Sequence, residues 1–238
     1  MPHFQTIWQV PPKRHTIFRK PDGGLYSEEL VSTEGFSDVY SLIYHAYPPT
    51  MVKAIGETVC VAPKIALKEN MQHRSFNGFK IGAADDFLES RKNVLVNKDV
   101  YIQLAAPRNS MKDYFYKNSQ ADEMIFVHRG KGKLHSIFGS IPFEYGDHVV
   151  IPRGTIYQIE FETQDNRLFI VESFHPLRFP KRYVNKYGQL LEHSPFCERD
   201  LKTPQNLVTH DEKGDFLVKI KRDDKLFHYV YATHPFDA

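Results

Sequence analysis

Twelve histidines give the chain many potential metal ligands, but their spacing matches no common metal-binding motif. No two of them form His-x-His, and none belongs to a His-Glu-x-x-His motif. His128 and His135 flank one predicted turn, and across a hairpin they could combine with Glu144. Two imidazoles and one carboxylate would suit non-haem iron. We favour the alternative that these are partly exposed strand residues, and we interpret His148 as a turn residue.

Nucleophilic and phosphate-binding chemistry have little support in the sequence. Cys60 and Cys197 are far apart and belong to no metal or redox spacing, and there is no Gly-x-Ser-x-Gly elbow. His193 and Glu198 lie near Cys197 without a known ligand spacing. Residues 130–133, Gly-Lys-Gly-Lys, join two predicted strands and open no helix, so we expect a hairpin turn rather than a phosphate loop. Both thiols are interpreted as structural and reduced.

A further pattern runs from Glu123 to Phe161. It reads Glu-x6-Gly and then Gly-x5-Pro-x-Gly-x2-Tyr-x3-Phe, with Tyr157 as its tyrosine. This spacing resembles that of the cupin β-barrels. The resemblance implies a His-x-His pair shortly before the glutamate and another histidine where Tyr157 stands. In this chain the pair falls on Lys117 and Ser119, or on Tyr116 and Asn118. None of these residues builds a good iron site, so we expect no metal ligand and no catalytic residue here.

Tyr157 is the candidate substrate-binding residue. The strand that contains it alternates cleanly, with Tyr157, Ile159 and Phe161 on one face and polar side chains on the other. Such alternation is typical of an antiparallel sheet with one wet side, and it points Tyr157 inward. We favour a role in filling the core, because tyrosine buries a large ring and needs one partner for its hydroxyl. Contact with a substrate is the alternative.

The elements that must position these residues are short strands. Eighteen phenylalanines and thirteen tyrosines favour pleated structure, and fifteen prolines and thirteen glycines interrupt the chain often. We predict an all-β fold, a cupin-type jelly-roll β-sandwich with an N-terminal arm and additional strands. The expected divisions are an extended arm over 1–25, a degenerate barrel over 26–174, and a crossing segment with a C-terminal hairpin over 175–238.

Individual strands can be placed from the alternation and the turn residues. Residues 168–171 are apolar on both faces and predict a central strand. A final hairpin is expected from 216–221 paired with 226–231, and a short helix within 83–92. The remaining predicted strands are 38–47, 94–96, 100–104, 124–128, 134–138, 149–151 and 157–162.

Charge and hydropathy exclude several classes of partner. Thirty-one basic and 29 acidic side chains leave a net charge of +2, which predicts no nucleic-acid binding. No stretch reaches the roughly 20 apolar residues of a membrane span, and the first 20 residues lack the apolar run of a signal peptide. We therefore expect a cytoplasmic protein with no membrane association.

Several longer motifs resemble the N-terminal portion of homogentisate 1,2-dioxygenase, in the shorter form seen in some bacteria. They lie in matching order over nearly the whole chain, at 25–30, 40–44, 115–119, 122–125, 151–154 and 234–237. The resemblance implies a two-cupin enzyme whose Fe(II) sits in the second cupin. It also implies cleavage of homogentisate, a small aromatic acid, to maleylacetoacetate in tyrosine and phenylalanine breakdown, and assembly into trimers or hexamers.

No residue of this chain matches an iron ligand of that family, so none is carried over. Three hypotheses remain open. The chain is the scaffold half of a ring-cleaving dioxygenase, inactive by itself and with no cofactor bound. Alternatively, it is a free-standing metal-free cupin that binds a small aromatic ligand or a protein partner. The third is a metalloenzyme built on His128, His135 and Glu144.

Overall fold

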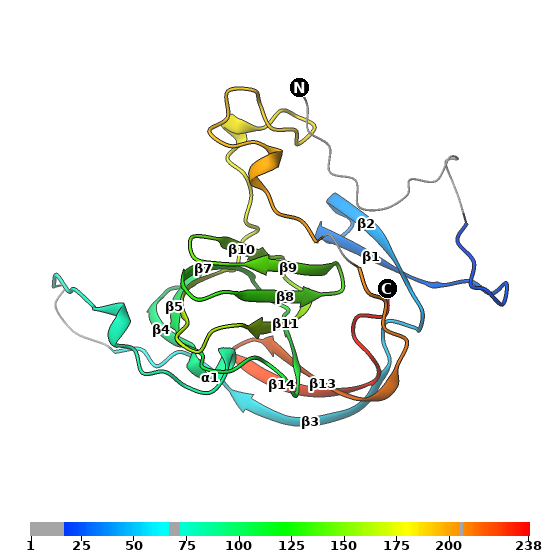
Figure 1. Cartoon of the computed structure of the whole chain (residues 1–238), viewed down its shortest axis with the longest axis horizontal. Coiled ribbons are helices and arrows are strands. Elements are labelled where there is room, and N and C mark those ends of the chain that lie inside the picture. The colour runs from blue at the N-terminus through cyan, green and yellow to red at the C-terminus, as the bar shows by residue number, and fades with distance from the viewer. Residues whose placement is uncertain (1–16, 67–71, 205–206) are drawn as a thin grey trace.

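The computed structural model describes residues 17–66, 72–204 and 207–238, and within them the chain forms a β-sandwich with little helix (Figure 1). One sheet has five strands in the order β10-β7-β12-β5-β4, and the other has seven in the order β3-β14-β13-β6-β11-β8-β9. A separate two-stranded sheet pairs β1 with β2. The strands are β1 (Ser27–Glu34), β2 (Ser37–His45), β3 (Val52–Cys60), β4 (Lys92–Val96), β5 (Val100–Ala105), β6 (Phe115–Asn118), β7 (Asp122–Arg129), β8 (Gly132–Ser136), β9 (Gly139–Phe143), β10 (His148–Ile151), β11 (Ile156–Phe161), β12 (Arg167–Ser173), β13 (Lys213–Arg222) and β14 (Lys225–Thr233).

The order of the strands is that of a jelly roll. From β6 to β12 the chain passes repeatedly between the two sheets, and every strand pair except β13 with β6 is antiparallel. The prediction of an all-β, cupin-type sandwich with additional strands is confirmed. The central position of 168–171 is confirmed too, because β12 lies between β7 and β5.

The turn at 130–133 corrects one prediction, because it is not a hairpin. β7 pairs with β10 and β12 in the five-stranded sheet, whereas β8 pairs with β9 and β11 in the other. Residues 134–138 therefore do not return beside 124–128. Gly130 adopts a φ of +110°, and a Cβ on Gly132 would lie 2.0 Å from the backbone oxygen of Glu160. Glycine lets the chain turn this corner between the sheets.

The core lies between the two sheets and consists of the side chains that point inward from their strands. The alternating burial along β7, β11 and β12 places one side of each strand against the other sheet. Tyr157 is fully buried, as the alternation of its strand predicts. A smaller cluster around Phe115, Val218 and Phe236 packs on the outer face of the seven-stranded sheet.

The C-terminal hairpin forms part of the seven-stranded sheet. β13 and β14 are joined by Asp223 and Asp224, both with positive φ, as a two-residue hairpin turn requires. β13 lies parallel to β6, and β3 pairs with β14 at the edge of the sheet. This confirms the predicted hairpin. It also puts residues beyond 175 in the same sheet as the barrel strands, although the predicted division at 174 stays a prediction.

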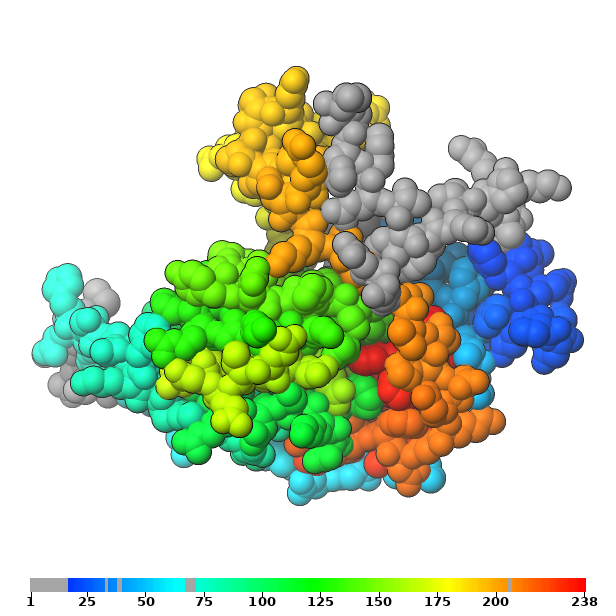
Figure 2. All heavy atoms as spheres, viewed as in Figure 1, coloured from blue at the N-terminus to red at the C-terminus, as the bar shows by residue number. Residues whose placement is uncertain are grey.

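The predicted helix is short, and the crossing between β12 and β13 is long. α1 (Phe87–Ser90) is a single turn within 83–92, and the 3-10 turn η1 (Gly78–Lys80) precedes it. The crossing after β12 contains two 3-10 turns, η2 (Lys181–Tyr183) and η3 (Glu198–Asp200). This segment, yellow to orange, stands out from the barrel (Figure 2). Of the predicted arm, 1–16 lie outside the described residues.

Candidate functional site

Glu123 points into the barrel interior, where the cupin pattern places a metal ligand, and its contacts there are with other side chains. It lies on β7 and is fully buried. The hydroxyl of Tyr157 donates a hydrogen bond of 2.6 Å to one carboxylate oxygen. The other oxygen lies 2.6 Å from Nη1 of Arg91. Both oxygens of Glu123 are thus already in contact with a donor or a cation.

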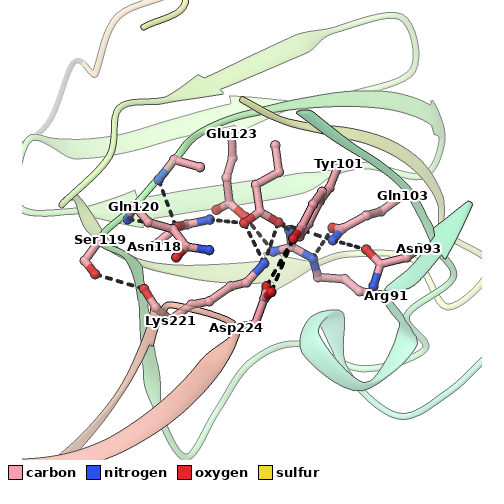
Figure 3. Close-up of polar contacts among 12 residues, drawn as sticks. Arg91, Asn93, Tyr101, Gln103, Asn118, Ser119, Gln120, Glu123, Lys221 and Asp224 are labelled. Carbon is pink, nitrogen blue, oxygen red and sulfur yellow. Dashed lines mark hydrogen bonds and ion pairs between the residues drawn. The ribbon is translucent and has the colours of Figure 1, made fainter. Parts of the chain in front are cut away.

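A second buried carboxylate, that of Glu172, stands next to Glu123. The two are register partners on the antiparallel strands β12 and β7. Nζ of Lys221 lies 2.5 and 2.7 Å from the two oxygens of Glu172, and Nη2 of Arg91 lies 3.3 Å from one of them. Asn118 and Gln103 each donate a further hydrogen bond to Glu172, at 3.0 and 3.2 Å. Figure 3 shows Arg91, Gln103, Asn118, Glu123 and Lys221 turned toward one another. We call Arg91, Glu123, Glu172 and Lys221 the buried ion cluster.

The two cations come from outside the pair of strands that carry the acids. Arg91 caps the C-terminus of α1, whose N-terminus is fixed by hydrogen bonds from the backbone of Leu88 and Glu89 to Asp86. Its guanidinium lies 5.2 Å from the ring of Phe87 and 5.8 Å from that of Tyr116. Lys221 comes from β13. Four separate parts of the chain therefore supply one cluster.

The pKa shifts favour the charged forms of Arg91 and Glu172 and the protonated form of Tyr157. Burial by itself lowers the pKa of Arg91, but the charges of Glu123 and Glu172 outweigh it and hold the pKa well above its usual value. Burial raises the pKa of Glu172, and the charges of Arg91 and Lys221 reverse this, so that the pKa is lowered. Burial and then the charge of Glu123 raise the pKa of Tyr157. Two cations thus balance two carboxylates around a neutral tyrosine donor.

Iron does not fit this arrangement. Tyr116 and Asn118 face the barrel interior, whereas Lys117 points to the outer face, so the former pair occupies the positions of the cupin histidines. Ser119 bonds to the backbone of Lys221. Non-haem iron requires neutral imidazoles, and the guanidinium of Arg91 contacts both carboxylates that could serve as ligands. Among the described residues, no group of three or more His, Cys, Asp or Glu side chains could hold a metal ion.

The alternative set of His128, His135 and Glu144 is not assembled, and that hypothesis is wrong. β7 and β8 belong to different sheets, so the two histidines do not face each other across a hairpin. His128 packs edge-on against Phe79, and His135 bonds to Ser140 and Glu160 at 2.7 and 3.1 Å.

The other singled-out residues also have ordinary surroundings. The backbone N–H of Cys197 bonds to Asp200 in η3, and Cys60 is an exposed free cysteine. His148 begins β10 and packs on Phe126, so it is a strand residue rather than the turn residue that we expected.

Tyr157 lines neither of the two cavities described here. One is a void of about 10 Å³ inside the barrel, and the other is a pocket of about 660 Å³ outside it. Its ring packs against Phe87 and Tyr116, with centroids 6.4 and 5.4 Å away. This geometry supports the interpretation that Tyr157 fills the core. Its contact with a substrate stays a prediction.

The larger cavity, which we call the hairpin pocket, lies between the β1–β2 hairpin and the outer face of the seven-stranded sheet. His45 stands on its wall, with Nε2 2.9 Å from Glu29 and Nδ1 2.7 Å from Asp237. Burial lowers the pKa of His45, but its bonds to Asp237 and Glu29 raise it to about 9. This triad ties the hairpin to the C-terminal residues.

Sequence reasoning missed Arg91, Glu172 and Lys221. For Glu172 a signal was available, because Leu168, Ile170 and Glu172 share the inward phase of β12. Arg91 and Lys221 come from segments that meet only in the folded protein. The hairpin pocket was also missed, since its walls come from distant parts of the chain.

These observations define a class: a cupin-type jelly-roll barrel whose metal position is filled by side-chain ion pairs. Residues 58–238 match the family described as homogentisate 1,2-dioxygenase, N-terminal. The chain belongs to this family.

Its relatives place the chain in a wider context. A putative dioxygenase of Saccharolobus solfataricus is 36% identical over 230 residues, which cover 97% of this chain and 59% of that protein. The chain thus spans about three-fifths of that relative's length.

Two solved structures resemble the barrel. A cupin-2 domain protein of Shewanella frigidimarina is 18% identical with a TM-score of 0.31, covering 35% of this chain and 79% of its own. KdgF of a Halomonas species is 16% identical with a TM-score of 0.33, covering 36% and 78%. These likenesses extend over about a third of the chain, and the fold assignment rests on the sheet topology. No helix among the described residues is long and apolar enough to cross a membrane.

Proposed function

We propose that this chain is the N-terminal, non-metal-binding part of a homogentisate 1,2-dioxygenase-like enzyme. The activity of the complete enzyme would be Fe(II)-dependent cleavage of the ring of homogentisate to maleylacetoacetate, in tyrosine and phenylalanine catabolism. Family membership and the similarity to a dioxygenase support the class of reaction. The 238 residues by themselves would be inactive.

The observation that carries the proposal is the buried ion cluster. Arg91 contacts both Glu123 and Glu172, and Lys221 contacts Glu172, so side chains supply the positive charge beside the two buried carboxylates. This geometry supports a structural role for the barrel, which would supply no step of the ring cleavage. The two unpaired cysteines support our proposal of a cytoplasmic protein. By the family resemblance we also propose that it assembles as a trimer or hexamer.

The test compares two proteins. The 238-residue chain is purified with Fe(II), its iron content is measured, and oxygen uptake is followed with homogentisate. We expect neither iron nor turnover. The protein encoded by the complete reading frame serves as the comparison and should show both. Stoichiometric iron together with oxygen uptake by the 238-residue chain would contradict the proposal.

The alternative is a free-standing metal-free cupin with an aromatic ligand near Tyr157. No observation at that residue favours it, because Tyr157 is fully buried and packed among other rings. A stop codon in the native gene directly after residue 238 would favour the alternative. A reading frame that continues into a second barrel with histidine and glutamate ligands would favour the proposed dioxygenase.

A further inference from the structure

The hairpin pocket has the size and lining of a small-molecule site. Its volume of about 660 Å³ falls within the range of roughly 300 to 1,000 Å³ that is usual for ligand pockets. Part of its wall is apolar, with Ile43, Ile137, Phe138 and Tyr231. Lys117 is a polar residue on that wall.

Strand geometry places Lys117 in the pocket. Tyr116 and Asn118 take the inward phase of β6, so Phe115 and Lys117 take the outward phase. Phe115 is covered by Phe236, while Lys117 lines the pocket. Lys117 is partly buried as a result.

Arg153 and His45, on the same wall as Lys117, are both paired with carboxylates, whereas the ammonium of Lys117 is not paired with any described carboxylate. Arg153 is held by Asp122, with its Nε 3.2 Å from a carboxylate oxygen. His45 is held between Glu29 and Asp237. In the part of the chain that the structure describes, no hydrogen bond or ion pair joins Nζ of Lys117 to another residue.

This position has an energetic cost that a ligand could remove. Burial lowers the pKa of Lys117, and the charge of the nearby Glu29 opposes this only in part. A partly buried ammonium without a hydrogen-bond acceptor is unfavourable, and a carboxylate is the acceptor that best compensates it.

We propose that the hairpin pocket binds a small monocarboxylic acid, with its carboxylate on the ammonium of Lys117 and its apolar body against Ile137, Phe138 and Tyr231. The single ammonium of Lys117 matches a ligand with a single negative charge. Ligands with several charges would meet Glu29 and Asp237 on the same wall. A neutral ligand would leave the ammonium without a counter-charge. This site is separate from the barrel interior and goes beyond the proposed function.

The experiment uses the 238-residue chain and benzoate as the probe. Binding is measured by titration calorimetry and by NMR shifts in isotope-labelled protein, with benzamide as the neutral analogue and terephthalate as the dianion. We expect saturable binding of benzoate in the millimolar range, as one charge-assisted contact with an apolar body would give. Benzamide and terephthalate should each bind at least about tenfold more weakly.

Substitutions of Lys117 test whether benzoate binds at this residue. Lys117→Met should weaken benzoate binding at least about tenfold, and Lys117→Arg should retain most of it. Lys202→Met is the matched control, because Lys202 is paired with Asp147 and does not line the pocket. Thermal melts confirm that each variant is folded.

Three results would overturn the proposal: no saturable binding of benzoate up to about 10 mM, equal binding of benzamide, or unchanged binding in folded Lys117→Met. None of them depends on iron or turnover. The two proposals can therefore fail separately.

Discussion

Glu123 and Glu172 lie directly opposite each other on neighbouring strands, and the guanidinium of Arg91 contacts both, at 2.6 and 3.3 Å. Two carboxylates at adjacent positions of a sheet repel each other, and burying their charges without a nearby cation is costly. Arg91 and Lys221 supply that charge from α1 and β13. The contacts that leave no place for iron thus also join both sheets.

Removing Arg91 should destabilise the fold strongly. In Arg91→Met the two buried carboxylates keep only Lys221 as a counter-charge, and breaking a buried ion pair costs about 3 to 5 kcal/mol. Urea denaturation measures the free energy of unfolding. Arg129→Met is the control, because the pair of Arg129 and Asp165 is exposed and should contribute no more than about 1 kcal/mol. Equal effects of the two substitutions would refute the structural role of the cluster.

The hydroxyl of Tyr157 should matter separately from its ring. Tyr157→Phe keeps the packing against Phe87 and Tyr116 but removes the donor to Glu123. We expect a loss of about 1 to 3 kcal/mol, the usual cost of leaving a buried acceptor without its partner. Tyr187→Phe, at an exposed position, should change stability by less than about 0.5 kcal/mol. Urea denaturation of both variants measures these changes. An unchanged free energy of unfolding in Tyr157→Phe would show that the bond to Glu123 does not contribute to stability.

The triad of Glu29, His45 and Asp237 should make stability depend on pH. The pKa of His45 is raised from 6.5 to about 9 in the folded protein, so its contribution is complete below pH 6.5 and is lost as the pH rises to about 9. The pKa of Glu29 is lowered from 4.5, chiefly by its bond to His45, so that contribution is lost as the pH falls below 4.5. Stability from the triad should therefore be greatest between these limits.

Melting temperatures of wild type and His45→Gln between pH 4 and 10 test this. The difference between the two proteins should be largest near pH 5 to 6 and should shrink by pH 9. A difference that stays constant from pH 6 to pH 10 would mean that the charge of His45 does not hold the hairpin.

The corner between β7 and β8 should tolerate no side chain at Gly132. A Cβ there would lie 2.0 Å from the backbone oxygen of Glu160 and 2.9 Å from the ring of Phe143. Backbone cannot yield as a flexible side chain can, so we expect Gly132→Ala to cost about 1 to 3 kcal/mol or more. Gly82→Ala, with open space around the added carbon, should change stability by no more than about 0.5 kcal/mol. Chemical denaturation of the two variants distinguishes them, and similar values would speak against the close approach.

Local patterns of residues determined much of this fold in advance. The alternation in β11 predicts that Tyr157 faces inward, and the apolar run at 168–171 predicts a central strand. The aspartates at 223 and 224 mark the turn of the C-terminal hairpin. These predictions succeed because the phase of a strand and the type of a turn depend on neighbouring residues.

Pairing between sheets could not be predicted in the same way. The glycines at 130 and 132 mark a sharp turn, but the sequence alone does not distinguish a hairpin from a corner between sheets. The incorrect hairpin prediction placed His128 and His135 next to each other, whereas in the structure they lie in different sheets.

The metal position of the barrel shows which features the sequence determined and which depended on the tertiary structure. The absence of histidines at positions 116–119 and at Tyr157 was evident from the residues alone. That Arg91 and Lys221 fill this position was decided only by the tertiary structure, because they reach Glu123 and Glu172 from distant segments. Local chemistry sets which side of a strand is buried, but the neutralisation of a buried charge depends on whichever segment the fold brings beside it.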